Sequence, residues 1–115
     1  MSNHVMLLVE DGLLQREVMA ELLMDEGYEV VECATAEAAE LIVASTGTEL
    51  RALVTDHNLA GNMTGAELAA YAREQHPRLT IVVISGKAVT RLPKNTLFLQ
   101  KPFPPQTLLE AVGGG

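Results

Sequence analysis

Short apolar runs recur along the chain, separated by longer segments of mixed polarity. Continuous apolar runs that are bounded by polar or turn residues are typical of strands buried on both faces of a parallel sheet. The four continuous runs are Val5–Val9, Ala52–Thr55, Ile81–Ile84 and Leu97–Leu99. A further, half-buried strand is predicted at Tyr28–Glu32, where apolar and polar residues are mixed. The pattern therefore predicts five strands.

The segments between these strands carry apolar residues at helical spacing. In the first segment, Leu14, Val18 and Leu22 recur among acidic and amide side chains, which is the pattern of an amphipathic helix. In the third segment, Thr64 is followed three residues later by Glu67, a capping-box pattern typical of the start of a helix. Helices are predicted over residues 14–25, 36–44 and 64–75.

The helical pattern weakens after the fourth apolar run. A glycine, a proline and an asparagine leave room for one short turn around Lys87–Arg91 at most, so the fourth helix is predicted to be shortened. A last, short helix is expected to begin near Pro104–Pro105, because proline suits the first turn of a helix. The three glycines at 113–115 carry no structural signal and are expected to be a tail or linker.

The alternation of strands and helices predicts one α/β domain over residues 1–115. Crossovers between parallel strands are nearly always right-handed, so helices are expected on both faces of the sheet. Placing the first and third strands side by side, where the strand order reverses, gives the order 2-1-3-4-5 of a doubly wound, flavodoxin-like sheet. In such sheets, ligands bind beyond the carboxyl ends of the strands.

Composition narrows the class of protein. The chain has 115 residues, of which 48% are hydrophobic, enough for one packed core. Its net charge is −7 and its basic residues do not cluster, which disfavours direct binding to nucleic acid or anionic lipid. A lone Cys33 cannot form an internal disulfide, and no apolar run approaches the length of a membrane span. A cytoplasmic domain without membrane insertion is expected.

Polar side chains suited to binding a metal or a phosphoryl group follow four of the predicted strands. Glu10 and Asp11 come after the first strand, and Asp56 ends the third. Ser85 ends the fourth strand, and Lys101 comes shortly after the fifth. Because the carboxyl ends of parallel strands meet at one edge of the sheet, these groups are expected to converge there. Three acids, a hydroxyl and an ammonium suit a divalent cation together with a phosphoryl group.

Asp56 is the candidate nucleophile. A carboxylate can attack a phosphoryl group and form an acyl phosphate when a cation neutralises the charge between the two. Mg²⁺ is the expected cation, because it prefers a few carboxylates and retained waters. Asp11 and Asp56 are the expected direct ligands, Glu10 binds directly or through a water, and the backbone carbonyl of Asn58 is suitably placed. An acidic pair at a strand end also has a plain interpretation, a solvated loop.

The other half of the predicted site binds the phosphoryl group. The Ser85 hydroxyl can donate to one phosphoryl oxygen, while the Lys101 ammonium balances another and can pair with the carboxylates beforehand. Gly86 would let a backbone N–H approach the phosphate closely, and Asn58 is a further expected phosphoryl-binding residue. Taken singly, a serine after a strand is a turn residue and a lysine before proline is a surface charge. Their joint placement at strand ends favours the functional interpretation.

Four stretches, in this order along the chain, carry a family resemblance: LLVED at Leu7–Asp11, LVTD at Leu53–Asp56, VVISG at Val82–Gly86 and FLQKPF at Phe98–Phe103. With them the chain resembles the receiver domains of two-component response regulators over nearly its whole length. The resemblance implies that a histidine kinase, a histidine phosphotransfer protein or a small phosphodonor phosphorylates Asp56 in the presence of Mg²⁺. It implies a signalling phosphoacceptor that catalyses only its own phosphorylation and dephosphorylation.

The resemblance also implies a switch built from Ser85 and Phe98. Ser85 moves toward the phosphoryl group, and Phe98 changes rotamer as the space behind Ser85 empties; a plain core role for Phe98 is the alternative. The Lys101–Pro102 bond is expected to be cis. Too few residues follow Phe103 for a DNA-binding or enzymatic module, so the expected output is a contact with a downstream protein, or service as a phosphate relay or sink.

Three features depart from the family pattern. The loop after Asp56 has Ala60 where the family often has proline, and it has one extra residue before Gly65. This variant is similar to receivers that are attached to hybrid sensor kinases or stand alone beside them. The segment between Ser85 and Lys101 is shorter than usual, and the final helix is short. Both changes reduce the face that most family members use to transmit the signal.

Two other classes of function are compatible with part of the pattern. A phosphorylation-independent interaction module on the same fold would normally have lost an acid or the lysine, and none is lost here. A small aspartate-nucleophile phosphatase would need a second acid two residues after Asp56, where this chain has Asn58. His57 invites a proton-relay role, but strand alternation points it away from Asp56, so a structural role is predicted.

Overall fold

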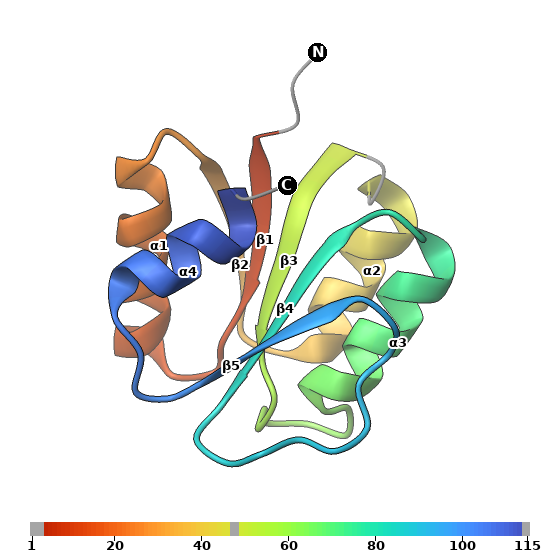
Figure 1. The fold of residues 1–115 in the computed structure, drawn as a ribbon. Helices are drawn as coiled ribbons and strands as arrows, with labels where there is room; N and C mark the ends of the chain where they lie inside the picture. The colour runs from red at the N-terminus through yellow and green to blue at the C-terminus, as the bar shows by residue number, and fades with distance from the viewer. Residues whose placement is uncertain (1–3, 47–48, 114–115) are drawn as a thin grey trace.

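A computed structural model describes residues 4–46 and 49–113 of the chain, which form one parallel sheet between two layers of helices (Figure 1). The strand order is β2-β1-β3-β4-β5, as predicted. In chain order the elements are β1 (Val5–Val9), α1 (Leu13–Asp25), β2 (Glu29–Cys33), α2 (Ala36–Thr46), β3 (Leu50–Asp56), α3 (Gly65–Gln75), β4 (Thr80–Ser85), β5 (Thr96–Gln100) and α4 (Pro105–Gly113).

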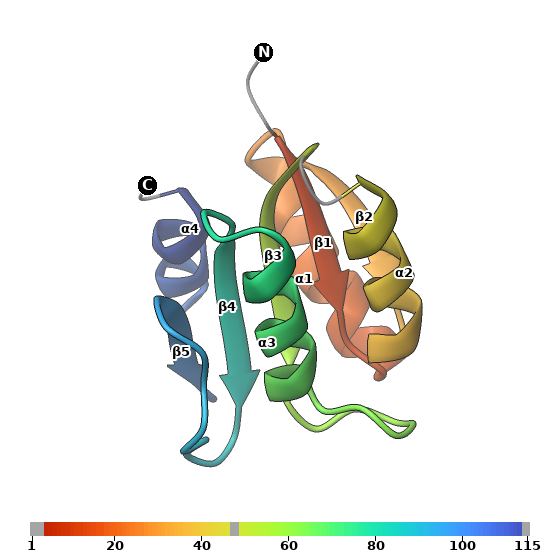
Figure 2. The ribbon, with the colours of Figure 1, turned by 90° about the vertical axis from the view of Figure 1, so that its right-hand side faces the viewer.

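The sheet separates two apolar cores, because neighbouring residues of a strand point to opposite faces. On the face covered by α2 and α3, Leu7 and Leu53 are fully buried. On the face covered by α1 and α4, Leu8 and Val54 are fully buried (Figure 2). This explains why the strands read as continuous apolar runs: β1, β3 and β4 are covered on both sides.

The predicted apolar stripe of α1 faces the sheet only in part. Leu14 and Val18 are 68% and 61% exposed, whereas Leu22 is half-buried against the core. The helix also packs on the sheet through Ala20 and Leu23, which are buried. Helix α1 carries apolar residues on two sides, and the spacing alone does not tell which side faces the sheet.

The connection between β4 and β5 contains no helix. The two strands are parallel neighbours, with Val82 opposite Leu97, but residues 86–95 between them form only bends and a turn. The shortened fourth helix that was predicted is therefore reduced to none, and the turn expected at Lys87–Arg91 does not form. Ten residues are fewer than a helical crossover needs, and Pro93 lacks the N–H of a helix.

Arg73 of α3 binds the end of this connection, just before β5. Its guanidinium donates to the carbonyls of Lys94 and Asn95, each at 3.0 Å, just before β5. It also donates to the carbonyls of Pro77 at 2.9 Å and Leu79 at 2.7 Å, just before β4. Burial lowers the pKa of the Arg73 guanidinium. One side chain therefore ties the entrances of two strands to α3.

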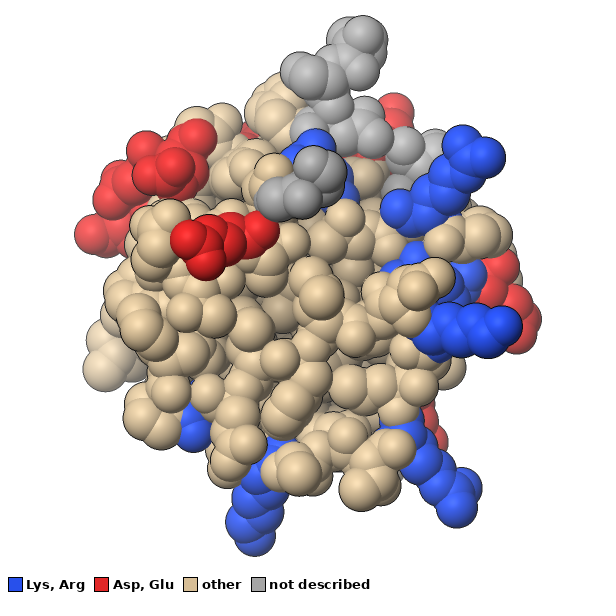
Figure 3. All heavy atoms as spheres, in the orientation of Figure 1, with Lys and Arg blue, Asp and Glu red and all other residues tan. Residues whose placement is uncertain are grey.

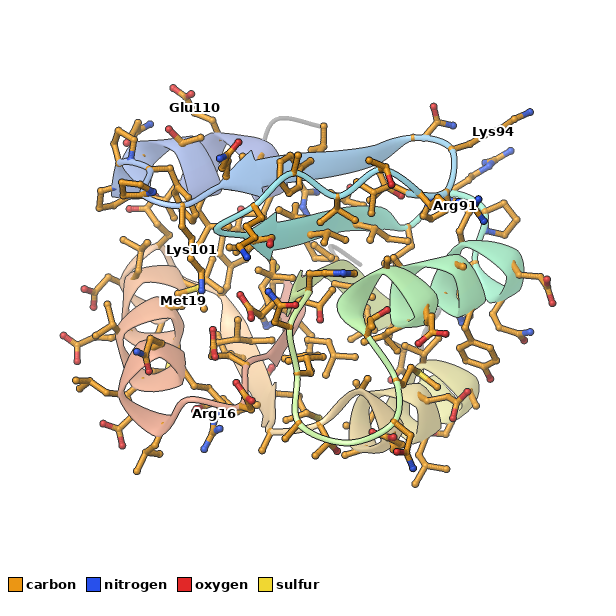
Figure 4. The ribbon with its side chains drawn as sticks, turned by 90° about the horizontal axis from the view of Figure 1, so that it is seen from below. Arg16, Met19, Arg91, Lys94, Lys101 and Glu110 are labelled. Atoms are coloured by element: carbon orange, nitrogen blue, oxygen red, sulfur yellow. The ribbon has the colours of Figure 1, made fainter. Side chains whose placement is uncertain are left out.

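Basic residues gather in space, although the sequence suggested that they do not cluster. Figure 3 shows several Lys and Arg side chains along the right-hand side of this view, with acidic side chains beside them, and a second group of acidic side chains at the upper left. Arg73 and Arg78 line the same groove at this end of the sheet. Arg91 and Lys94 lie on the same side in the view from below (Figure 4). Several basic side chains therefore lie on one side of the molecule, mixed with acidic ones, in a chain of net charge −7.

The C-terminal segment differs from the prediction at one residue. Gly113 is the last residue of α4 rather than the start of a tail; Gly114 and Gly115 lie outside the described residues. Arg51 of β3 donates to the carbonyls of Val112 and Gly113, each at 3.1 Å, which stabilises the end of this helix. The Lys101–Pro102 bond is cis, as expected. No helix in the described part of the chain is long and apolar enough to cross a membrane.

Candidate functional site

The predicted site residues lie at the edge of the sheet where the strands end. Asp56 is the last residue of β3 and Ser85 the last of β4, and Glu10 directly follows β1. These three polar residues are only 6%, 2% and 4% exposed. Figure 4 views the molecule from this side and shows Lys101 near Met19, between α1 and the end of β5. The apolar strands therefore carry polar groups into a nearly buried position.

An ion-pair cluster forms the centre of the site. The Lys101 Nζ lies 2.9 Å from Asp56 Oδ1 and 3.8 Å from Glu10 Oε1. Burial acts to lower the pKa of Lys101, but its hydrogen bond and charge interaction with Asp56, followed by the charge of Glu10, outweigh burial and raise that pKa. Burial is the largest cause of the raised pKa of Glu10, and the Asp56 charge adds to it. The expected pairing of the ammonium with the carboxylates is present.

The donor atoms around this cluster suit a hard cation. Glu10 Oε2 accepts the Gly12 N–H at 2.9 Å, while the buried Glu10 Oε1 accepts no hydrogen bond from the described residues. A buried carboxylate oxygen without a donor is stabilised when a cation binds to it. However, no three acidic, histidine or cysteine side chains of residues 4–46 and 49–113 are gathered closely enough to hold one ion together. The chemistry fits Mg²⁺, and a shared site requires a side chain to move.

Asp11 is a predicted ligand that contacts both the Glu10 carboxyl, whose pKa it helps to raise, and the loop between β3 and α3. Its Oδ2 accepts the backbone N–H of Ala60 at 3.0 Å, so the carboxylate contacts the loop between β3 and α3. The same loop carries the exposed Asn58, whose carbonyl is a predicted ligand. Asp11 and Asn58 are therefore near the site, and their ligand roles stay predictions.

The loop between β3 and α3 is also held by Glu37, which the sequence analysis did not single out. Glu37 Oε2 accepts the N–H of Asn62 at 2.9 Å. Gly61 lies beside it with a φ of +101°, and a Cβ on Gly61 would stand 2.9 Å from Glu37 Oε1. Glycine is required here by both the backbone conformation and the space. In the sequence, Glu37 shows only as an acid in the first turn of a helix.

The start of α3 packs directly on the end of β3. The N–H of Gly65 donates to the carbonyl of His57 at 2.9 Å, and a side chain on Gly65 would overlap the backbone of Asp56. The Nδ1 of His57 accepts the N–H of Ala66 at 3.3 Å. His57 thus fixes the first turn of α3, which confirms its predicted structural role.

The residues predicted to bind and sense the phosphoryl group lie on β4 and β5. Ser85 Oγ accepts the N–H of Lys87 at 3.2 Å, and the Ser85 carbonyl accepts the N–H of Lys101 at 2.9 Å. Gly86 is exposed, and a Cβ there would meet no atom within 4 Å. Phe98 is partly buried opposite Val83 and belongs to neither apolar core. The phosphoryl contacts of Gly86 and the switching of Phe98 stay predictions.

An apolar groove of about 440 Å³ opens beside the ion-pair cluster. It lies between α1 and the segment after β5, with Glu10 and Lys101 at one end. Its other lining residues are Leu14, Gln15, Val18, Met19, Pro102 and Phe103. The exposed Leu14 and Val18 of α1 are therefore part of one surface that reaches the buried acids.

Comparisons with known proteins agree on one family. The family model described as "Response regulator receiver domain" matches residues 6–113. The response regulator protein FleR of Pseudomonas aeruginosa is 31% identical over 112 residues, a match that covers 92% of this chain and 23% of FleR. The chain thus spans about a quarter of the length of this curated relative.

Solved structures share the fold. A response regulator receiver protein from Sinorhizobium medicae WSM419 has a TM-score of 0.89 at 27% identity, covering 96% of this chain and 91% of that chain. The receiver domain of the hybrid histidine kinase CckA has a TM-score of 0.81 at 34% identity, covering 96% of both chains. The receiver domain of the sensor histidine kinase PA1611 from Pseudomonas aeruginosa PAO1 has a TM-score of 0.84 at 22% identity, covers 98% and 97%, and was solved with a coordinated magnesium ion.

Proposed function

Because the chain belongs to the response regulator receiver domain family, we propose that Asp56 accepts a phosphoryl group from the histidine of a kinase or phosphotransfer protein. The observation that carries this proposal is the position of Asp56, which is 6% exposed at a strand end with Lys101 Nζ 2.9 Å from its Oδ1. A nearly buried carboxylate next to an ammonium suits a reaction that places more negative charge at the same point.

In the proposed reaction, a carboxylate oxygen of Asp56 attacks the phosphorus of the donor. An O–P bond forms, the P–N bond to the donor imidazole breaks, and its electron pair returns to the imidazole nitrogen. The Lys101 ammonium then balances the charge of one phosphoryl oxygen, and the Ser85 hydroxyl donates to another. The product is an acyl phosphate on Asp56.

Mg²⁺ would be held by Glu10, Asp11, Asp56 and the carbonyl of Asn58, and when bound it supplies neutralisation of the charge between carboxylate and phosphoryl group. The support for this ligand set is its chemistry, since all four groups offer the hard oxygen ligands that Mg²⁺ prefers and the buried Glu10 Oε1 accepts no hydrogen bond from the described residues. Glu10 would keep its hydrogen bond from the Gly12 N–H and offer the other oxygen.

The groove beside the cluster supports a protein as the donor. A phosphohistidine has to reach Asp56 from the solvent side of this edge, where Leu14 and Val18 are 68% and 61% exposed. Large exposed apolar side chains next to a reactive group are typical of a protein-binding surface. We place the donor on α1 and the segment after β5, with its histidine over Lys101 and Asp56.

Two outputs follow from phosphorylation in this proposal. A relay or sink for phosphate needs only the site itself, whereas a binding switch also needs a surface that changes through Ser85 and Phe98. The connection between β4 and β5 has no helix to present such a surface. Relay or sink is therefore the simpler output, and the switch requires that residues 86–95 or β5 contact the downstream protein.

The test is phosphorylation by a small phosphodonor. The protein is incubated with acetyl phosphate and Mg²⁺, and its intact mass is compared with that of Asp56→Asn and with a sample containing a chelator. A phosphoryl adduct that requires both Asp56 and Mg²⁺ supports the proposal. Absence of an adduct under excess donor would overturn it and would favour the phosphorylation-independent interaction module.

A further inference from the structure

Two carboxylates from neighbouring segments hold the middle of the loop between β3 and α3. Asp11, after β1, accepts the Ala60 N–H at 3.0 Å. Glu37, in the first turn of α2, accepts the Asn62 N–H at 2.9 Å. The two N–H donors are two residues apart. The centre of the loop is therefore bound by Asp11, an acid of the site, and by Glu37, an acid outside it.

The two contacts differ in their surroundings. Glu37 Oε1 is buried, and it occupies the space that a Cβ on Gly61 would need. Asp11 is exposed, and it reaches the loop from the end of β1, beside the ion-pair cluster. The Glu37 contact is therefore fixed by packing, whereas the Asp11 contact is open to exchange with another partner.

Asp11 faces two partners of unequal strength. A hydrogen bond between an exposed carboxylate and a backbone N–H contributes little net free energy, because water competes for both groups. A divalent cation that binds at Oδ2, the oxygen that accepts the Ala60 N–H, makes a stronger contact with it than this hydrogen bond does. In the structure, however, no three acidic side chains of the described ranges are gathered around one point. The Oδ2 of Asp11 accepts the loop N–H, while the same carboxyl interacts with Glu10.

We propose that the Ala60 N–H competes with the metal for the Asp11 carboxylate, so that metal binding releases Ala60 and leaves the loop held by Glu37. This inference rests on the proposed function, because it takes Asp11 as a metal ligand. It assigns a role to position 60: an N–H at this position weakens the affinity for Mg²⁺. It also couples the ion to the loop that carries Asn58, whose carbonyl becomes free to turn toward the metal.

Hydrogen exchange on the unmodified protein tests the release directly. Amide exchange rates of Ala60 and Asn62 are measured by NMR with and without saturating Mg²⁺. We expect Ala60 to exchange about fivefold faster with Mg²⁺, the ratio that corresponds to one lost exposed hydrogen bond. The Asn62 amide, held by Glu37, is the internal control and should keep its rate. An Ala60 amide that is equally or better protected with Mg²⁺ would overturn the proposal.

A pair of variants tests the competition. Ala60→Pro removes the N–H, whereas Ala60→Gly keeps it and serves as the matched control. Calorimetric titration with Mg²⁺ should give a Kd about fivefold lower for the proline variant than for parent and glycine variant. A weaker or equal Kd in Ala60→Pro would show that the N–H orients Asp11 instead of competing for it.

Separate results would overturn the proposed metal site and the proposed competition at Asp11. If parent protein does not bind Mg²⁺ at all, the proposed metal site fails, and the competition at Asp11 fails with it. If Mg²⁺ binds and Asp11→Ala weakens it, but the Ala60 amide stays protected, the metal site stands and only the competition is overturned.

Discussion

Replacing Gly65 with alanine tests the packing of α3 on the end of β3. A Cβ at this position would overlap the carbonyl oxygen of Asp56 and lie 2.8 Å from both the Asp56 carbonyl carbon and the His57 Cα. All of these are backbone atoms, so they cannot turn away as a flexible side chain would. The strand that carries Asp56 and the helix that follows it must therefore separate.

Two opposing effects set the size of the change. Alanine is a better helix former than glycine by up to about 1 kcal/mol. Inserting a methyl group into a closely packed region costs about 1–3 kcal/mol. Because rigid backbone is in the way, packing outweighs helix propensity, and Gly65→Ala should lower the free energy of unfolding by about 2 kcal/mol. The phosphorylation rate should fall as well, since the displaced backbone belongs to Asp56.

Urea denaturation followed by circular dichroism gives this free energy for each variant. Gly86→Ala is the matched control, because a Cβ at Gly86 meets no atom within 4 Å. Its free energy of unfolding should stay within about 0.5 kcal/mol of the parent value. An unchanged or higher stability of Gly65→Ala would refute the reasoning, and so would equal losses in both variants.

Three further predictions test other contacts. Glu10→Gln should raise the free energy of unfolding at neutral pH, because burial raises the pKa of Glu10 and so disfavours its charged form in the folded chain; between the ordinary glutamate pKa and this raised pKa, the folded chain holds a proton that the unfolded chain has released. Stability therefore falls as the pH rises through this interval, and the gain should vanish in urea titrations below the ordinary glutamate pKa; a gain that does not depend on pH would contradict this cause. Arg73→Met should lower the free energy of unfolding by about 2 kcal/mol, because four backbone carbonyls lose their donor; the same urea assay would show a negligible loss if water replaces the guanidinium. Lys87→Ala should change the decay rate of phosphorylated Asp56, followed by intact mass, because Lys87 is expected to flank, with Asn58, the path of the water that attacks the acyl phosphate. The Kd for Mg²⁺ should stay the same, and identical decay curves would rule out this role for Lys87.

The centre of the sheet could be predicted because β1, β3 and β4 are buried on both faces, whereas the edge strand β5, predicted from a similar run, is partly exposed. Ile81–Ile84 can only be a covered strand, and the matching run at Val5–Val9 places a second one. Once the strand order is known, the convergence of Asp56 and Lys101 follows, since parallel strands end at the same edge. The convergence of the charged groups could therefore be predicted from the topology of the sheet alone, without knowledge of any distance.

The parts that could not be predicted depend on contacts between distant residues. Nothing in the local sequence tells that Glu37 reaches the loop of Gly61, or that Arg73 binds the carbonyls before β5. The predicted orientation of α1 differs from the structure for a related reason. Leu14 and Val18 make a helical stripe as regular as a buried one, and only the packed sheet shows that it faces outward.

The connection between β4 and β5 changes how this molecule can respond to an event at Ser85. Among the described residues, no backbone hydrogen bond joins two residues within 86–95, so this stretch has no cooperative unit that must melt or re-form. It is held at Ser85, at the carbonyls bound by Arg73, and between them at Leu92, which packs against the core on the α2 and α3 face. A displacement of Ser85 would then be taken up by the residues between Ser85 and Leu92 instead of moving a rigid helix as one body.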